Sequence, residues 1–175
     1  MRILNTTLMI VIFSFGLSAF GGAEKELLIA SMKGDESKVD SLIAGGVDVN
    51  FANGKGLTAL MLASLKGHES IVKKLVSNSA DLNKQDVSGV TALMAACKQG
   101  HAPVAKALLA GGADVNAANS QGMTCLFMAA QAGKKEIVEL ALSNGANKGA
   151  KTTTGVSAAD AASMANHSDI ANMLK

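Results

Sequence analysis

The chain has 175 residues, enough for one domain of ordinary size, and its charges nearly cancel. Lysine and arginine total 16 against 14 for aspartate and glutamate, so the balance predicts no nucleic-acid-binding or membrane-binding surface. Hydrophobic residues make up 49% of the chain, but aromatic residues only 3%. This composition favours many small contacts between thin layers over one large globular core.

Residues 1–23 differ in character from the rest of the chain. One arginine precedes an apolar run over 8–20, and small residues follow as far as Ala23. The run is too short to cross a bilayer comfortably, which indicates a secretory signal peptide. We expect cleavage after Ala23, with Ala19 or Gly21 as alternatives, and a periplasmic or secreted protein with no membrane contact after cleavage. A buried first helix or an uncleaved anchor is the other interpretation.

The segment 89–116 contains the unit that the rest of the chain repeats. Thr91 is a candidate N-cap, apolar residues follow at helical spacing, and Gly100 ends this first helix. A second apolar stripe predicts a second helix, which stops before the glycine pair at 111–112. One such hairpin cannot bury its own apolar face, so it needs a copy on each side.

The copies are recognised by landmark residues that recur every 33 positions. Each copy has a glycine at its start, a hydroxyl residue two positions later and a second glycine between its helices. The three series are Gly56, Gly89, Gly122 and Gly155; Thr58, Thr91, Thr124 and Ser157; and Gly34, Gly67, Gly100 and Gly133. Fixed self-similarity at this period is characteristic of a stacked repeat array.

These landmarks resemble the ankyrin repeat, whose consensus reads roughly G-x-T-P-L-H-x-A-A-x-x-G-H, then I-V-x-x-L-L and G-A-D-V-N. The motif proline and the motif histidine are replaced in the copies of this chain. The resemblance implies an all-α solenoid of about five stacked helix-turn-helix repeats with short hairpin-like connecting turns. We assign the repeats to 24–53 (N-terminal cap), 54–86, 87–119, 120–152 and 153–175 (C-terminal cap).

Three histidines, His68, His101 and His167, hold the same repeat position, which raises the question of a metal site. Equivalent residues of stacked helices lie ~10 Å apart, so successive copies cannot share one zinc ion at ~2 Å per ligand. In the ankyrin family this histidine follows the turn glycine and caps the outer helix. We therefore expect a structural role, and no metal or cofactor.

Cys97 and Cys125 form an even pair in a chain with an export signal, which suggests a disulfide. Cys125 stands five residues earlier in its helix than the position equivalent to Cys97. Five residues of rise combined with one helix spacing place the two Cα atoms roughly 12 Å apart. A disulfide needs a separation within ~7 Å, so we predict two free, buried thiols.

No catalytic constellation is evident in the sequence. The stretch 145–152 resembles a phosphate-binding loop, but it follows a predicted outer helix rather than a strand, so we interpret it as a coincidence. A hydrolase using Asp160 or the cysteines is the rival class, and we expect no enzyme.

The resemblance implies a non-enzymatic, monomeric module that binds a partner protein on a concave face. The stacking of Leu57, Val90 and Met123 ~10 Å apart would form an apolar ridge along that face; the other interpretation is that they only cover neighbouring turns. Counting along the repeat places the partner-binding residues at the turn tips and inner-helix ends: Lys55, Leu57, Leu65, Lys66, Ser88, Val90, Lys98, Gln99, Gln121, Met123 and Gln131.

Exported arrays of this size resemble bacterial accessory proteins that bind or protect an envelope protein. The partner could be an envelope enzyme that is stabilised, or a toxic enzyme that is inhibited by an immunity-type protein. A secreted effector that acts inside a host is a third possibility.

Overall fold

The computed structural model describes residues 21–175. The predicted signal peptide, 1–23, therefore lies almost entirely outside the described residues. Within 21–175 the chain forms ten helices: α1 (Gly22–Lys33), α2 (Glu36–Ala44), α3 (Ala59–Lys66), α4 (Glu69–Ser77), α5 (Ala92–Gln99), α6 (Ala102–Ala110), α7 (Cys125–Gln131), α8 (Lys135–Ser143), α9 (Ala158–Met164) and α10 (Ser168–Leu174).

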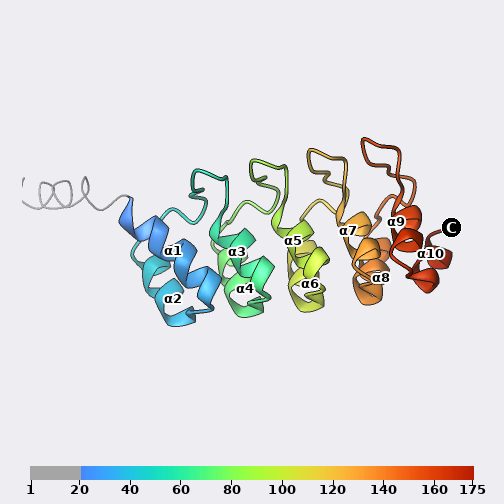
Figure 1. Cartoon of the computed structure of the whole chain (residues 1–175). Helices are drawn as coiled ribbons and strands as arrows, with labels where there is room; N and C mark the ends of the chain where they lie inside the picture. Colours follow the sequence, from blue (N-terminus) through green and yellow to red (C-terminus); the bar gives the residue numbers. More distant parts are fainter. Residues whose placement is uncertain (1–20) are drawn as a thin grey trace, which may run out of the picture.

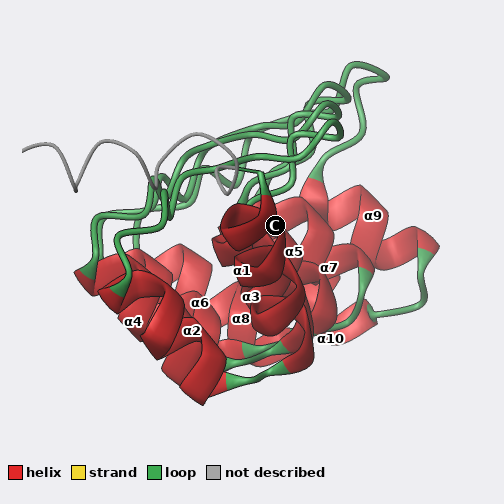
Figure 2. Cartoon of the chain, turned by 90° about the vertical axis from the view of Figure 1, so that its left-hand side faces the viewer, coloured by secondary structure: helices red, strands yellow, loops and turns green. Residues whose placement is uncertain are grey.

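The helices form five pairs stacked side by side, as the sequence predicts (Figure 1). We call α1, α3, α5, α7 and α9 the inner row, and α2, α4, α6, α8 and α10 the outer row. The long loops before α3, α5, α7 and α9 are called fingers here, and they project together on one side of the two rows (Figure 2). The described part contains no strand, only an isolated bridge between Lys151 and Ser157. The prediction of an all-α repeat solenoid is confirmed.

Hydroxyl caps start four of the inner helices. Thr58, Thr91 and Thr124 each accept a hydrogen bond from the backbone N–H three residues later, at 3.2, 3.3 and 3.3 Å. Ser157 forms a full capping box with Asp160, in which each side chain accepts from the other residue's backbone N–H. These bonds satisfy amide groups that the first helical turn leaves without partners.

Each turn glycine at 34 and 67 packs against the histidine ring of the next repeat. Gly67 has a left-handed φ of 78°, and a Cβ added there would lie 2.7 Å from the His101 ring. His101 Nε2 lies 3.2 Å from the carbonyl oxygen of Leu65, and His68 contacts Met32 in the same way. The expectation that these histidines cap their own outer helices is wrong, since neither side chain makes a cap bond. They join consecutive repeats instead.

The prediction of two free thiols is also wrong, because Cys97 and Cys125 form a disulfide with their Cα atoms 5.5 Å apart. The predicted separation of roughly 12 Å includes the full spacing between helix axes, as if both residues pointed the same way. In the structure they lie on facing sides of α5 and α7, which brings each Cα about 2.3 Å from its own axis toward the other helix. The Cα separation of 5.5 Å leaves almost no difference in height along the helix axes. Cys97 near the end of α5 is therefore level with Cys125 at the start of α7, which means that the two helices are shifted relative to each other along their axes.

The disulfide occupies a position that small residues fill elsewhere in the inner row. Pairs 28 residues apart, like the two cysteines, hold the same register in the other repeats: Ser31 with Ala59, Ser64 with Ala92, and Ala130 with Ala158. All of these residues are buried. Small side chains at these positions allow neighbouring inner helices to approach closely.

Candidate protein-binding site

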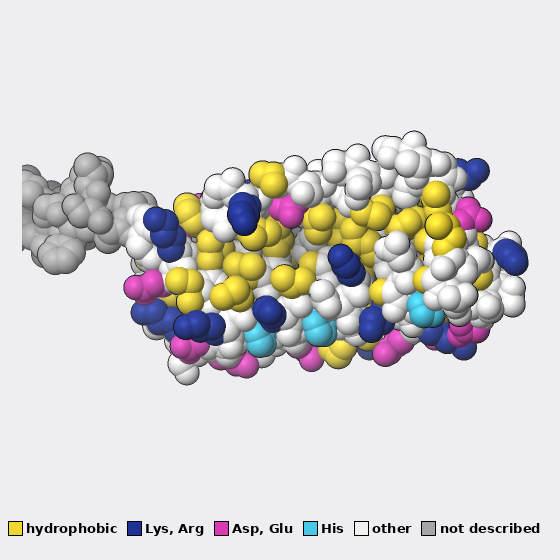
Figure 3. Space-filling model, in the orientation of Figure 1, with side chains coloured by type: hydrophobic (Ala, Val, Ile, Leu, Met, Phe, Trp, Pro, Cys, Tyr) yellow, Lys and Arg dark blue, Asp and Glu magenta, His cyan; other side chains and the backbone are white. Residues whose placement is uncertain are grey.

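An apolar band runs along the face formed by the inner helices and the fingers (Figure 3). Its central part is a hollow of about 350 Å³, here called the central pocket, which lies over α5 between α3 and α7. Met61 and Met94 form its buried floor, and Leu62 and Leu65 contribute one wall. A volume of this size accepts one or two large apolar side chains.

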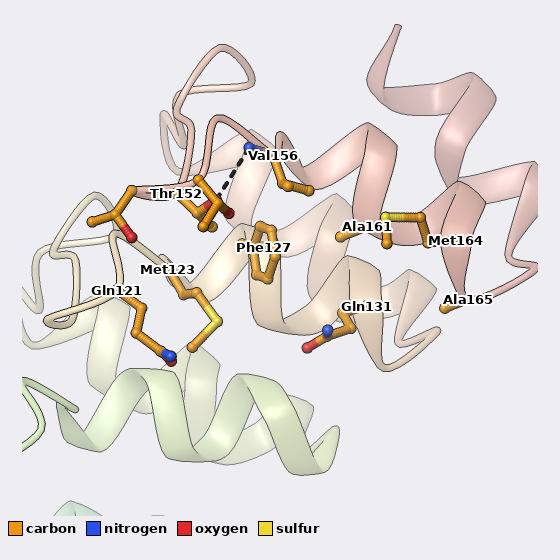
Figure 4. Close-up of a pocket in the computed structure, with 11 residues that line it drawn as sticks. Gln121, Met123, Phe127, Gln131, Thr152, Val156, Ala161, Met164 and Ala165 are labelled. Carbon is orange, nitrogen blue, oxygen red and sulfur yellow. Dashed lines mark hydrogen bonds between the residues drawn. The ribbon is translucent and has the colours of Figure 1, made fainter.

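A second hollow of about 450 Å³, the C-terminal pocket, lies between α7 and α9. Figure 4 shows Phe127 in its middle, with Met123 on one side and Ala161 and Met164 on the other. Met164, which lines this pocket, is 77% exposed. Met123 and Gln121 line both pockets, so the two hollows adjoin.

The structure brings most of the predicted binding residues together. The central pocket is lined by Leu57, Leu65, Ser88, Val90, Lys98, Gln99, Gln121 and Met123, and the C-terminal pocket adds Gln131. Lys55 and Lys66 are exposed but line neither pocket. The sequence predicts an apolar ridge at Leu57, Val90 and Met123, but Leu57 and Met123 are half-buried and pack against the core as well as lining the central pocket.

Sequence reasoning missed the apolar floor of both pockets, which includes Met61, Met94, Phe127 and Met128. These residues stand at helical spacing and were indistinguishable from core residues. A signal was present in the three methionines, because methionine is over-used at adaptable binding surfaces.

The fingers are held in place by backbone contacts with one another. The N–H groups of Val87, Ser120 and Thr153 donate to carbonyl oxygens of the preceding finger at 3.1, 3.0 and 3.0 Å. An added Cβ at Gly89 would meet the backbone of the next finger at 2.8 Å, so only glycine allows this approach. The pocket walls are therefore preformed by backbone structure rather than by side chains alone.

The groups considered for catalysis are engaged in structural roles. Cys97 and Cys125 are buried and bonded to each other, so neither is available as a nucleophile. The hydroxyl of Ser157 and then its backbone N–H hold the pKa of Asp160 below its ordinary value. Asp160 thus serves as a helix cap.

Within the described residues, 21–175, no group of three or more His, Cys, Asp or Glu side chains is placed to hold a metal ion. No helix of this part is long and apolar enough to cross a membrane.

The stacked hairpins, finger loops and inner-face pockets define a repeat scaffold. The chain belongs to the ankyrin repeat family: the family model described as ankyrin repeats (3 copies) matches residues 27–119 and 111–175. No curated protein matches the chain. Membership of this family makes the chain a protein–protein interaction module on a scaffold that is typically non-catalytic.

Proposed function

We propose that the protein is exported and binds a partner protein in the two adjoining pockets of its inner face. The partner would be a protein of the cell envelope or of the extracellular space. The observation that carries this proposal is the pair of adjoining pockets, because they gather exposed and half-buried apolar side chains on one face.

Stability of the stack does not explain this apolar lining. Leu65 is 37% exposed and Met164 is 77% exposed, although both positions could hold polar residues without disturbing the core. An apolar centre with a polar rim is the usual composition of a protein interface. Gln99, Gln121 and Gln131 contribute to such a rim.

Export is supported by two independent features. The sequence over 1–23 has the charge, length and small residues of a signal peptide. The disulfide between Cys97 and Cys125 is a type of bond that persists mainly in oxidising compartments. Amino-terminal sequencing of the protein from its native host should begin near Glu24, and an intact Met1 in a cytoplasmic fraction would contradict export.

The binding face is tested by capture from the native envelope with the full-length chain tagged at its carboxyl terminus. We expect Leu65→Asp to reduce capture of the specific partner at least tenfold, because a buried unpaired carboxylate costs well over 1.4 kcal/mol.

Val87→Asp is the matched control, since Val87 is 76% exposed and lines neither pocket. Lys106→Asp tests the outer row, and neither control should affect capture. Loss of capture with Lys106→Asp but not with Leu65→Asp would place the binding site on the outer row and contradict the proposal.

The effect on the partner is a separate question. If the partner is an enzyme, mixing it with the purified protein should either prolong its activity or reduce it. Prolonged activity would identify a stabiliser of an envelope enzyme, and reduced activity an immunity-type inhibitor.

A further inference from the structure

Lysine side chains border the apolar band without internal partners. In the described part of the chain, Lys33, Lys55, Lys66 and Lys98 make no ion pair, whereas Lys38, Lys73 and Lys74 do. Lys98 lines the central pocket, and Lys66 follows Leu65 at the end of the neighbouring helix α3.

The carboxylates on the same face are already engaged. Asp86 lines the central pocket, but its Oδ1 accepts from the backbone N–H groups of Ser88 and Val90 at 2.8 and 2.9 Å. Asp160 is occupied by its capping box with Ser157. Asp86 keeps its charge, but its Oδ1 is bound within its own finger, whereas Lys66 and Lys98 have no internal ion-pair partner. This arrangement favours a partner with carboxylates beside its apolar residues.

The spacing of the pockets restricts the partner further. The central pocket lies over α5 and the C-terminal pocket lies between α7 and α9, so their centres are one to two repeat spacings apart, roughly 15 Å. On a helix, residues i and i+7 are ~10.5 Å apart along the axis and residues i and i+11 are ~16.5 Å apart, and both pairs lie on one face.

A helix suits this face better than an extended segment. An extended segment leaves its backbone N–H and C=O groups without internal partners along an apolar surface, and it gains affinity mainly by pairing with an exposed strand edge. The structure over 21–175 contains no strand that could supply such an edge. A helix satisfies its own backbone groups and can insert apolar side chains into both pockets.

We infer that the partner presents an acidic amphipathic helix of about three turns, with large apolar residues at i and i+7 or i+11 and flanking Asp or Glu. This inference rests on the proposed function and specifies the chemistry of the partner. The apolar side chains occupy the two pockets, and the carboxylates contact Lys66 and Lys98.

The test uses a random 16-residue peptide library displayed on phage and selected on the full-length protein. We expect the enriched peptides to be acidic, with apolar residues at helical spacing. An enriched peptide, synthesised with a fluorescent label, should gain helical circular dichroism on binding. Its Kd should rise about tenfold in the double variant Lys66→Glu/Lys98→Glu, because two attractive contacts become repulsive. The double variant Lys73→Glu/Lys106→Glu, with the same charge change on the outer row, is the control.

Enrichment of basic or non-helical peptides, no enrichment at all, or equal Kd changes in the two double variants would overturn the inference. The proposed function has a separate outcome. If Leu65→Asp abolishes capture of the natural partner but the partner segment cross-linked to the pockets is basic or extended, the inner-face site stands and only the acidic helix is wrong.

Discussion

The inner and outer rows of helices follow the same repeat but are built differently. Inner helices meet through small buried residues, and one junction, between α5 and α7, is closed by a disulfide. In the outer row, an open groove of about 980 Å³ lies over α6. Charged side chains of α4 and α8 border it, among them Lys73 and Glu139. Contacts between α2 and α4 include ion pairs of Lys74 with Glu36 and Asp40 at 3.3 and 2.7 Å.

This difference indicates where stability and binding lie. Both rows bury apolar side chains in the core, for example Leu93 in the inner row and Leu108 in the outer row, whereas the exposed ion pairs of the outer row contribute little. The stack should therefore tolerate change at the exposed positions of its outer row, and the inner row combines closely packed helices with an apolar surface. Substitutions in the two rows should differ accordingly.

Removal of the disulfide should have the largest effect on stability. The variant Cys97→Ser/Cys125→Ala reproduces the residues that the preceding junction carries at Ser64 and Ala92. Because the bridge closes a loop with a sequence separation of 28, the chain-entropy model predicts a loss of about 3–4 kcal/mol in the free energy of unfolding. Urea denaturation measures it, and a reducing agent should weaken the native protein but not the variant. Two free thiols in denatured, unreduced protein would show that the bridge does not form.

A second bridge at the preceding junction should have the opposite effect. Ser64→Cys/Ala92→Cys places cysteines at the register positions of the native pair, so we expect a disulfide and a gain of about 1–3 kcal/mol. Mass spectrometry before and after reduction detects the bond. The outer-row pair Lys73→Cys/Lys106→Cys is the control and should stay reduced; if it closes as readily, the two rows do not differ in packing.

The contact between turn glycine and histidine is tested by two glycines with the same backbone conformation. Gly46 and Gly67 have φ values of 79° and 78°, but only Gly67 faces a histidine ring. Gly46→Ala should cost about 1 kcal/mol through its left-handed backbone alone. Gly67→Ala should cost about 1 kcal/mol more, because the ring of His101 must move and its contact with Leu65 is lost. If urea denaturation shows the same loss in the free energy of unfolding for both variants, the contact between Gly67 and His101 does not contribute to stability.

The outer row should show the smallest effect, and it should depend on pH. The hydroxyl of Ser70, and then Lys74, hold the pKa of Glu36 below its ordinary value of 4.5. The pKa of Glu36 is therefore lower in the folded than in the unfolded state. The contacts of Glu36 stabilise the fold fully above the unfolded-state pKa, and this stabilisation is lost as the pH falls through the folded-state pKa. Ser70→Ala should therefore lower the unfolding midpoint slightly near neutral pH and hardly at all in acid. Ser77→Ala should show no such pH dependence, because the Ser77 hydroxyl bonds only to Lys74 and Asn78, which are not carboxylates.

The sequence was sufficient for features that depend on short stretches. Caps such as Thr91 and turn glycines such as Gly100 act within one helix end, so their spacing predicted every repeat. The disulfide was missed because it depends on the offset between α5 and α7, which no single repeat encodes. The sequence did contain one indication of this close approach, since pairs of small residues recur 28 positions apart, as at Ser64 and Ala92.

The candidate site was predictable at the finger tips but not at its floor. Gln121 and Met123 were predicted by counting along the repeat to the turn tips, and they line both pockets. Met94 and Phe127 were not, because an apolar residue on a short helix can face either the core or a hollow. Only the arrangement of neighbouring repeats decides between these two environments.

Amide hydrogen exchange of the protein, alone and in complex with its captured partner, distinguishes a binding site on the inner face from one on the outer row. We expect the partner to slow exchange in the fingers and at the carboxyl ends of α3, α5 and α7, and to leave exchange in α4, α6 and α8 unchanged. Protection confined to the outer row, with unchanged exchange around Leu65 and Met123, would contradict a site on the inner face.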